Sequence, residues 1–160
     1  YPIESSLIDP GYKDNEQSLT NLTTVIGMIL NSPENTVEHI VVAGFSSPDG
    51  HYSYNDRLAF ERAVSIKKYL MEKTGSPDHK ILVYNGSVDW RGLRYLVLRG
   101  DITEKEDIIN IIDNVAVEGR PGRLTELRRL NNGTTYRVLA RDYFPLLRNG
   151  AFIKVYYSNK

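Results

Sequence analysis

The residues best suited to chemistry in this chain are polar side chains that follow a short apolar run. The run, residues 40–43, reads Ile-Val-Val-Ala, which is typical of a buried strand. Ser46, Ser47 and Asp49 come directly after it, and Arg62 follows a few residues later. The planar guanidinium group of an arginine binds a carboxylate through two parallel hydrogen bonds, so this cluster suits binding of a ligand that carries a carboxylate.

The elements around these residues predict where the side chains meet. Residues 48–50, Pro-Asp-Gly, predict a turn, because proline presets φ and glycine accepts a positive φ. Residues 53–56 have capping-box spacing, which predicts that a helix begins there. Asn55, Leu58 and Arg62 lie at i, i+3 and i+7 and therefore share one face of that helix. The arginine thus points across a loop at the C-terminal end of a strand, where open α/β sheets bind ligands.

This segment resembles the signature of the OmpA C-terminal-like peptidoglycan-binding domains. The family signature reads roughly G-x-T-D-x-x-G-x-x-x-Y-N-x-x-L-S-x-x-R-A. Without a gap, the chain reads Gly44-x-Ser46-x-x-x-Gly50-x-x-x-Tyr54-Asn55-x-x-Leu58-x-x-x-Arg62-Ala63. Residues 1–7 are similar to the family's opening strand, and residues 151–155 to its closing strand. The resemblance covers about residues 1–88 and 145–158.

The resemblance implies an α/β fold, specifically an α+β sandwich with a β-α-β-α-β core. Apolar spacing predicts a sheet with helices packed on one face. The predicted strands are residues 1–8, 37–43, 81–84 and 151–157, and the predicted core helices are residues 14–30 and 58–73. A helical insertion is expected at about residues 90–145, with its last helix, residues 135–144, stopped by Pro145.

The resemblance also implies a ligand. Members of that family hold the side-chain end of diaminopimelate in the peptidoglycan stem peptide, with an arginine on the carboxylate and an aspartate on the ammonium group. The arginine carries over to Arg62, but the aspartate position holds Ser47, which supplies no countercharge. Asp49, two residues on, supplies a carboxylate if the loop rearranges. The other expected ligand-binding residues are Ser46, Asn55 and Arg148.

A purely structural role stays open for two of these residues. Arg62 can clamp the loop of residues 46–50 through its carbonyl groups, and Asn55 can serve as a cap or a loop brace. Leu58 and Ala63 are expected in the core.

A second function also stays open: an OmpA-like fold that has lost wall binding and serves as a protein–protein interaction module in a cell-surface assembly. Ser47 in place of the family aspartate favours it, as does the long helical insertion. Tyrosine is frequent at 11 residues, and tyrosines are common at protein interfaces. The tyrosines considered for such a surface are Tyr52, Tyr54, Tyr95, Tyr143, Tyr156 and Tyr157.

A hydrolase is the third class that the residues suggest, because a strand, Ser46 and a helix follow one another as in a nucleophile elbow. The elbow needs a small residue two positions after the serine, and this chain has Pro48 there. The three histidines lack metal-ligand spacing, and no Gly-rich phosphate loop is present. We therefore expect a non-catalytic protein with no cofactor and no metal.

Composition sets the remaining expectations. A chain of 160 residues fits a single domain, residues 1–160, and we expect it to be the C-terminal part of a longer envelope protein. No stretch approaches the ~20 apolar residues of a membrane span. Residues 120–160 hold nine of the 20 Lys and Arg but only two of the 20 Asp and Glu, yet they carry no nucleic-acid-binding motif. We therefore expect no nucleic-acid partner. The resemblance places such a domain on the periplasmic side of the Gram-negative outer membrane, with the peptidoglycan stem peptide, and envelope proteins, as expected partners.

Overall fold

The central element of the molecule is a strand, β1 (Asn35–Ser46), with a partner strand on each side. The computed structural model describes residues 5–9, 11, 15–148 and 151–159. β2 (Ile81–Val88) pairs with β1 in parallel, and β3 (Ala151–Asn159) pairs with it antiparallel, which gives the order β2-β1-β3. The predicted α/β class and the three strands from β1 onward are confirmed, although each of these strands extends beyond its predicted range.

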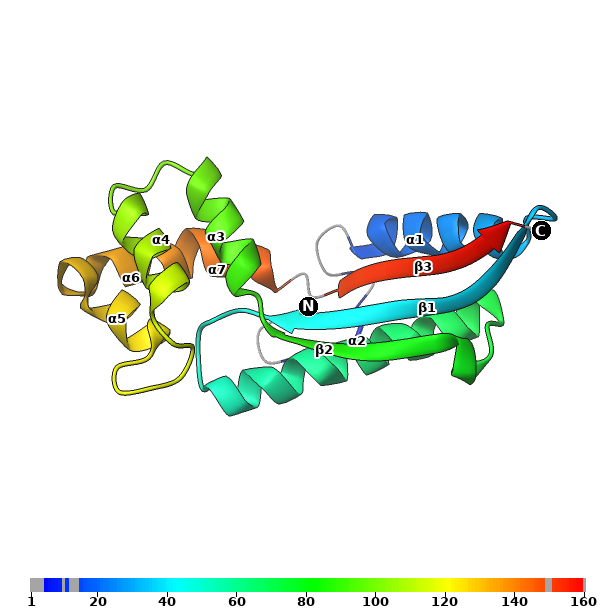
Figure 1. Ribbon diagram of the computed structural model, residues 1–160, viewed down its shortest axis with the longest axis horizontal. Helices are drawn as coiled ribbons and strands as arrows, with labels where there is room; N and C mark the ends of the chain where they lie inside the picture. Colours follow the sequence, from blue (N-terminus) through cyan, green and yellow to red (C-terminus); the bar gives the residue numbers. More distant parts are fainter. Residues whose placement is uncertain (1–4, 10, 12–14, 149–150, 160) are drawn as a thin grey trace.

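Two helices, α1 (Asn15–Leu30) and α2 (Tyr52–Thr74), pack on one face of this sheet (Figure 1). Alternate strand residues point toward them, because side chains alternate between the two faces of a strand. Ile40 and Val42 of β1 are completely buried there. The cluster under the helices also contains Ile26, Val37, Ala63, Ile66, Leu70 and Ile81.

The opposite face of the sheet is uncovered in the described part of the chain (Figure 1). Its apolar side chains are exposed: Leu82 by 49%, Tyr84 by 64% and Tyr156 by 37%. Lys154 extends over the ring of Tyr156, and the ring of His39 stacks on the same tyrosine with centroids 4.4 Å apart.

A second group of helices lies between β2 and β3 and stands at one end of the sheet (Figure 1). Its members are α3 (Trp90–Arg99), α4 (Lys105–Asn114), α5 (Arg123–Arg129), α6 (Thr134–Val138) and α7 (Phe144–Leu147). Short 3-10 turns cover Asp78–Lys80 before β2 and Leu130–Gly133 after α5. The predicted helical insertion is confirmed, and none of the described helices combines the length and apolarity needed to cross a membrane.

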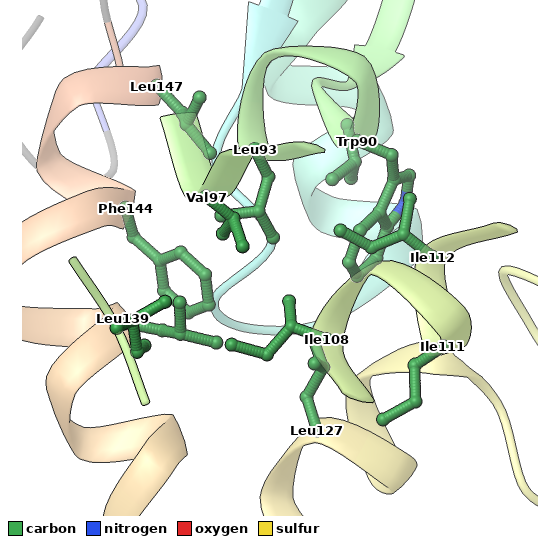
Figure 2. Packing of buried hydrophobic residues seen from close by; sticks show 12 residues of the cluster. Trp90, Leu93, Val97, Ile108, Ile111, Ile112, Leu127, Leu139, Phe144 and Leu147 are labelled. Atoms are coloured by element: carbon green, nitrogen blue, oxygen red, sulfur yellow. The ribbon is translucent and has the colours of Figure 1, made fainter. Parts of the chain in front are cut away.

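The inserted helices have a hydrophobic core of their own. Leu93, Ile108, Leu127, Leu139 and Phe144 are fully buried and converge from successive elements (Figure 2). Val88 and Trp90, where β2 leads into α3, also belong to this cluster. The segment that connects β2 to α3 therefore joins the insertion to the sheet and also contributes side chains to the core of the insertion.

Pro145 does not stop the last helix, contrary to the prediction. A π-helical turn, Leu139–Tyr143, follows α6, and in it the Phe144 N–H donates to Leu139 five residues earlier. Pro145 then lies in the first turn of α7, where a backbone N–H has no helical partner to lose. The π-helical turn thus accommodates Pro145, and the chain remains helical until Leu147.

Two predictions differ from the structure: the opening strand and the start of the second core helix. The predicted opening strand, residues 1–8, is not seen in residues 5–8, and residues 1–4 lie outside the described residues. Helix α2 begins at Tyr52 with His51 as its N-cap, so the residue 53–56 capping box does not form. The loop before α2 is consequently shorter than the sequence suggested.

The ion pair between α3 and α4 should give stability a small acid dependence. Arg94 donates to both oxygens of Asp113 at 2.8 and 2.9 Å, and this hydrogen bonding holds the pKa of Asp113 below its ordinary 3.8. A lowered folded-state pKa means that the stabilisation is present above pH 3.8 and is lost as the pH falls below it. Asp113→Asn should therefore lower the melting temperature slightly near pH 6, because the pair is exposed.

The measurement is thermal unfolding of both proteins between about pH 6 and pH 3. The difference in melting temperature should shrink toward acid. A difference that is constant or grows toward acid would contradict a pair that is formed in solution.

Candidate functional site

The loop between β1 and α2 surrounds a cavity at the C-terminal end of β1. The cavity has a volume of about 380 Å³, within the usual range for small-molecule sites. It is lined by Ser47, Asp49, Gly50, His51, Tyr54, Asn55, Leu58, Arg62 and Arg148. It therefore lies where the parallel strands of α/β sheets usually present their ligand sites.

The loop is held in shape by Asn55 from the first turn of α2. Its side-chain amide donates to the carbonyl oxygens of Ser47 at 3.1 Å and Asp49 at 2.8 Å. Asn55 is only 5% exposed, so these bonds are shielded from water. Gly50 completes the turn with φ +106°, a conformation that other residues rarely adopt. The structural role expected for Asn55, a loop brace, is the one that these contacts give it.

Arg62 lies about two turns further along α2. It is 1% exposed. Its Nε donates to the Ser5 carbonyl oxygen at 3.0 Å, and its Nη1 donates to the Phe45 carbonyl oxygen at 3.1 Å. The arginine thus ties the N-terminal segment and the end of β1 to α2. It has the clamping contacts expected of a structural residue, and it also lines the cavity.

Asp49 and Arg148 form an ion pair across the cavity. Arg148 Nη2 donates to Asp49 Oδ2 at 2.8 Å, with side chains 13% and 28% exposed. Arg148 is the C-cap residue of α7, so the packing of the inserted helices positions its side chain beside the loop. Asp49 Oδ1 is buried and has no hydrogen-bond partner among the described residues.

The structure places five of the six expected ligand-binding residues around this one cavity: Ser47, Asp49, Asn55, Arg62 and Arg148. Ser46 is the exception, since it is 1% exposed and does not line the cavity. Four further residues line the cavity, although the sequence had not predicted them as ligand-binding residues: Gly50, His51, Tyr54 and Leu58. The helical spacing of residues 51, 54, 58 and 62 was a usable signal for three of those four, because such residues share one face.

The cavity does not contain a hydrolase arrangement in its described residues. Ser46 Oγ is buried without a hydrogen-bond partner, whereas a catalytic serine bonds to a base. The His51 Nδ1 lies 3.5 Å from Ser53 Oγ. The described residues also contain no group of three or more His, Asp or Glu that could hold a metal ion.

The described residues thus form an α/β fold with helices on one face of its sheet and a cavity after β1. The sequence model of the OmpA family matches residues 12–91, half of the chain, and the protein belongs to that family. No curated protein matches the sequence. Domains of the OmpA family are generally associated with peptidoglycan, are typically non-catalytic, and usually sit in the periplasm or cell envelope.

Proposed function

We propose that this chain binds peptidoglycan without catalysis, through the cavity between β1 and α2, and anchors an outer-membrane protein to the cell wall. The ligand would be the diaminopimelate-containing stem peptide, and the site would face the periplasm. The observation that carries the proposal is the convergence of five expected binding residues on a single cavity in an OmpA-family fold.

The chemistry of the cavity supports an acidic ligand group. Arg62 and Arg148 both line it, and guanidinium groups bind carboxylates with paired, charge-assisted hydrogen bonds. Leu58 and Tyr54 supply apolar surface beside them for the aliphatic part of a side chain. Because Asn55 and Gly50 fix the loop, the site is formed before a ligand arrives, which reduces the entropic cost of binding.

The test is co-sedimentation of the purified chain with isolated cell-wall sacculi. The wild type should sediment in a saturable manner, and Arg148→Gln should bind at least about tenfold more weakly, because it removes a positive charge from the cavity. Arg141→Gln is the matched control: Arg141 also pairs with an aspartate, Asp142, but on an exposed surface outside the cavity.

The control variant should bind like the wild type. Equal binding by all three proteins would place the wall contact elsewhere on the chain. A wild type that stays in the supernatant at about 100 μM would contradict wall binding altogether.

The uncovered sheet face favours a second function, a protein–protein interaction module in a cell-surface assembly. Exposed Leu82, Tyr84 and Tyr156 gather there, and aromatic side chains are enriched at interfaces. The tyrosines named from the sequence lie on several separate elements rather than on this face alone. They are Tyr52 and Tyr54 on α2, Tyr95 on α3, Tyr143 in the π turn, and Tyr156 and Tyr157 on β3. A negative result with sacculi would make this second function the better one.

A further inference from the structure

The ion pair between Asp49 and Arg148 bears on which part of a ligand the cavity recognises. A zwitterionic ligand needs a cation for its carboxylate and a carboxylate for its ammonium group. Asp49 is the only carboxylate among the described residues that line the cavity, since the family's aspartate position is Ser47. The availability of Asp49 therefore decides whether an ammonium group has a countercharge here.

Both oxygens of Asp49 are unsuited to receiving an ammonium group from the solvent. Oδ2 already accepts a hydrogen bond from Arg148 at 2.8 Å. Oδ1 is shielded from solvent and accepts no hydrogen bond from the described residues. An incoming ammonium group would have to displace a partly buried guanidinium group or open the loop, which Asn55 holds by two hydrogen bonds.

The charges of the described lining residues also favour an anion. Arg62 and Arg148 carry two positive charges against the one negative charge of Asp49. Ser47 adds a hydroxyl group without a charge. A neutral hydrogen bond to an ammonium group is roughly half as strong as a charge-assisted one.

We propose that Arg148 takes the place of the ligand's ammonium group, so that the cavity recognises the carboxylate and accepts the neighbouring amine whether it is free or acylated. This inference rests on the proposed function, because it concerns the same stem peptide in the same cavity. Arg148 is then the residue that sets specificity, and it comes from the helical insertion rather than from the motif around residues 44–63.

The test compares three synthetic stem peptides that differ only at the far end of diaminopimelate: the unmodified form, a form with the amine acetylated, and a form with the carboxylate converted to an amide. Binding to the whole 160-residue chain is followed by NMR shifts of backbone amides or by calorimetry. Acetylation should change the dissociation constant by less than about twofold, whereas amidation should weaken binding at least about tenfold.

The outcomes separate this inference from the proposed function. Binding that falls about tenfold on acetylation would overturn the inference and leave wall binding in place, because the ammonium group would then be recognised. Equal binding of the amide would also overturn it. Failure of all three peptides to bind would overturn both.

Arg148→Gln gives a second test, because acetylation of the amine should weaken binding to this variant although it should not weaken binding to the wild type. Without Arg148, Asp49 Oδ2 loses its cation and becomes available to an ammonium group. The variant should therefore prefer the free amine over the acetylated form by about tenfold, a preference that the wild type lacks. Arg141→Gln should show the wild-type ratio, and an unchanged ratio in Arg148→Gln would contradict the role given to Arg148.

Discussion

Gly44→Ala should destabilise the protein by about 3 kcal/mol or more, because no side chain fits between β1 and α2 at this position. A Cβ atom on Gly44 would lie 2.0 Å from the Ala59 carbonyl oxygen and 2.7 Å from the Ala63 backbone nitrogen. Both are backbone atoms of a helix, so relief requires moving α2 rather than rotating a side chain. β1 is also the central strand and cannot move away without disturbing β2 and β3.

Urea-induced unfolding measures the change, and Gly27→Ala in α1 is the matched control. Nothing lies within 4 Å of a Cβ atom on Gly27, which is in a helix. The control should be unchanged or more stable by about 0.5–1 kcal/mol, because alanine favours helix. Wild-type stability in Gly44→Ala would mean that α2 does not pack this closely on β1.

Arg62→Ala should cost about 2–4 kcal/mol of stability, independent of any ligand. The substitution removes the donors to the carbonyl oxygens of Ser5 and Phe45 and leaves a void where a fully buried side chain was. A buried carbonyl oxygen that has lost its hydrogen-bond donor destabilises the folded state, because it is removed from water without a replacement partner. The matched control is Arg57→Ala on the same helix, where the side chain is 67% exposed.

The control should stay within about 0.5 kcal/mol of the wild type in urea unfolding. A fully stable Arg62→Ala would show that its two bonds to backbone carbonyls contribute nothing. The expected destabilisation has a practical consequence: loss of wall binding in Arg62→Ala would not separate a binding role from a folding role. Arg148, which is partly exposed and lies at a helix end, is the more informative position.

Family membership associates this chain with a general class of function, and the cavity is the location that we propose for it. OmpA-family domains are generally associated with peptidoglycan, and the matched residues 12–91 include the whole β1–α2 segment that forms most of the cavity. The helical insertion lies almost entirely outside that match. Arg148, at the end of α7, lies outside the matched residues and shortly before β3.

The amino-acid sequence by itself determined the local features of this protein. The apolar run before Gly44, the turn around Gly50 and the shared helix face of Asn55, Leu58 and Arg62 depend on spacing within a few residues. Such features follow from the periods of strands and helices, and the structure contains each of them.

Only the tertiary structure decided how distant segments meet. Arg148 reaches Asp49 across 99 positions of sequence because the inserted helices pack into their own core and end beside the loop. Pro145 did not end the helix before it, since a π turn removed the conflict that local rules predicted. Ser46 belongs to the sequence motif but does not line the cavity, because it is buried at the end of β1. Contacts of this kind depend on packing across the whole chain, and short-range periodicity carries no information about them.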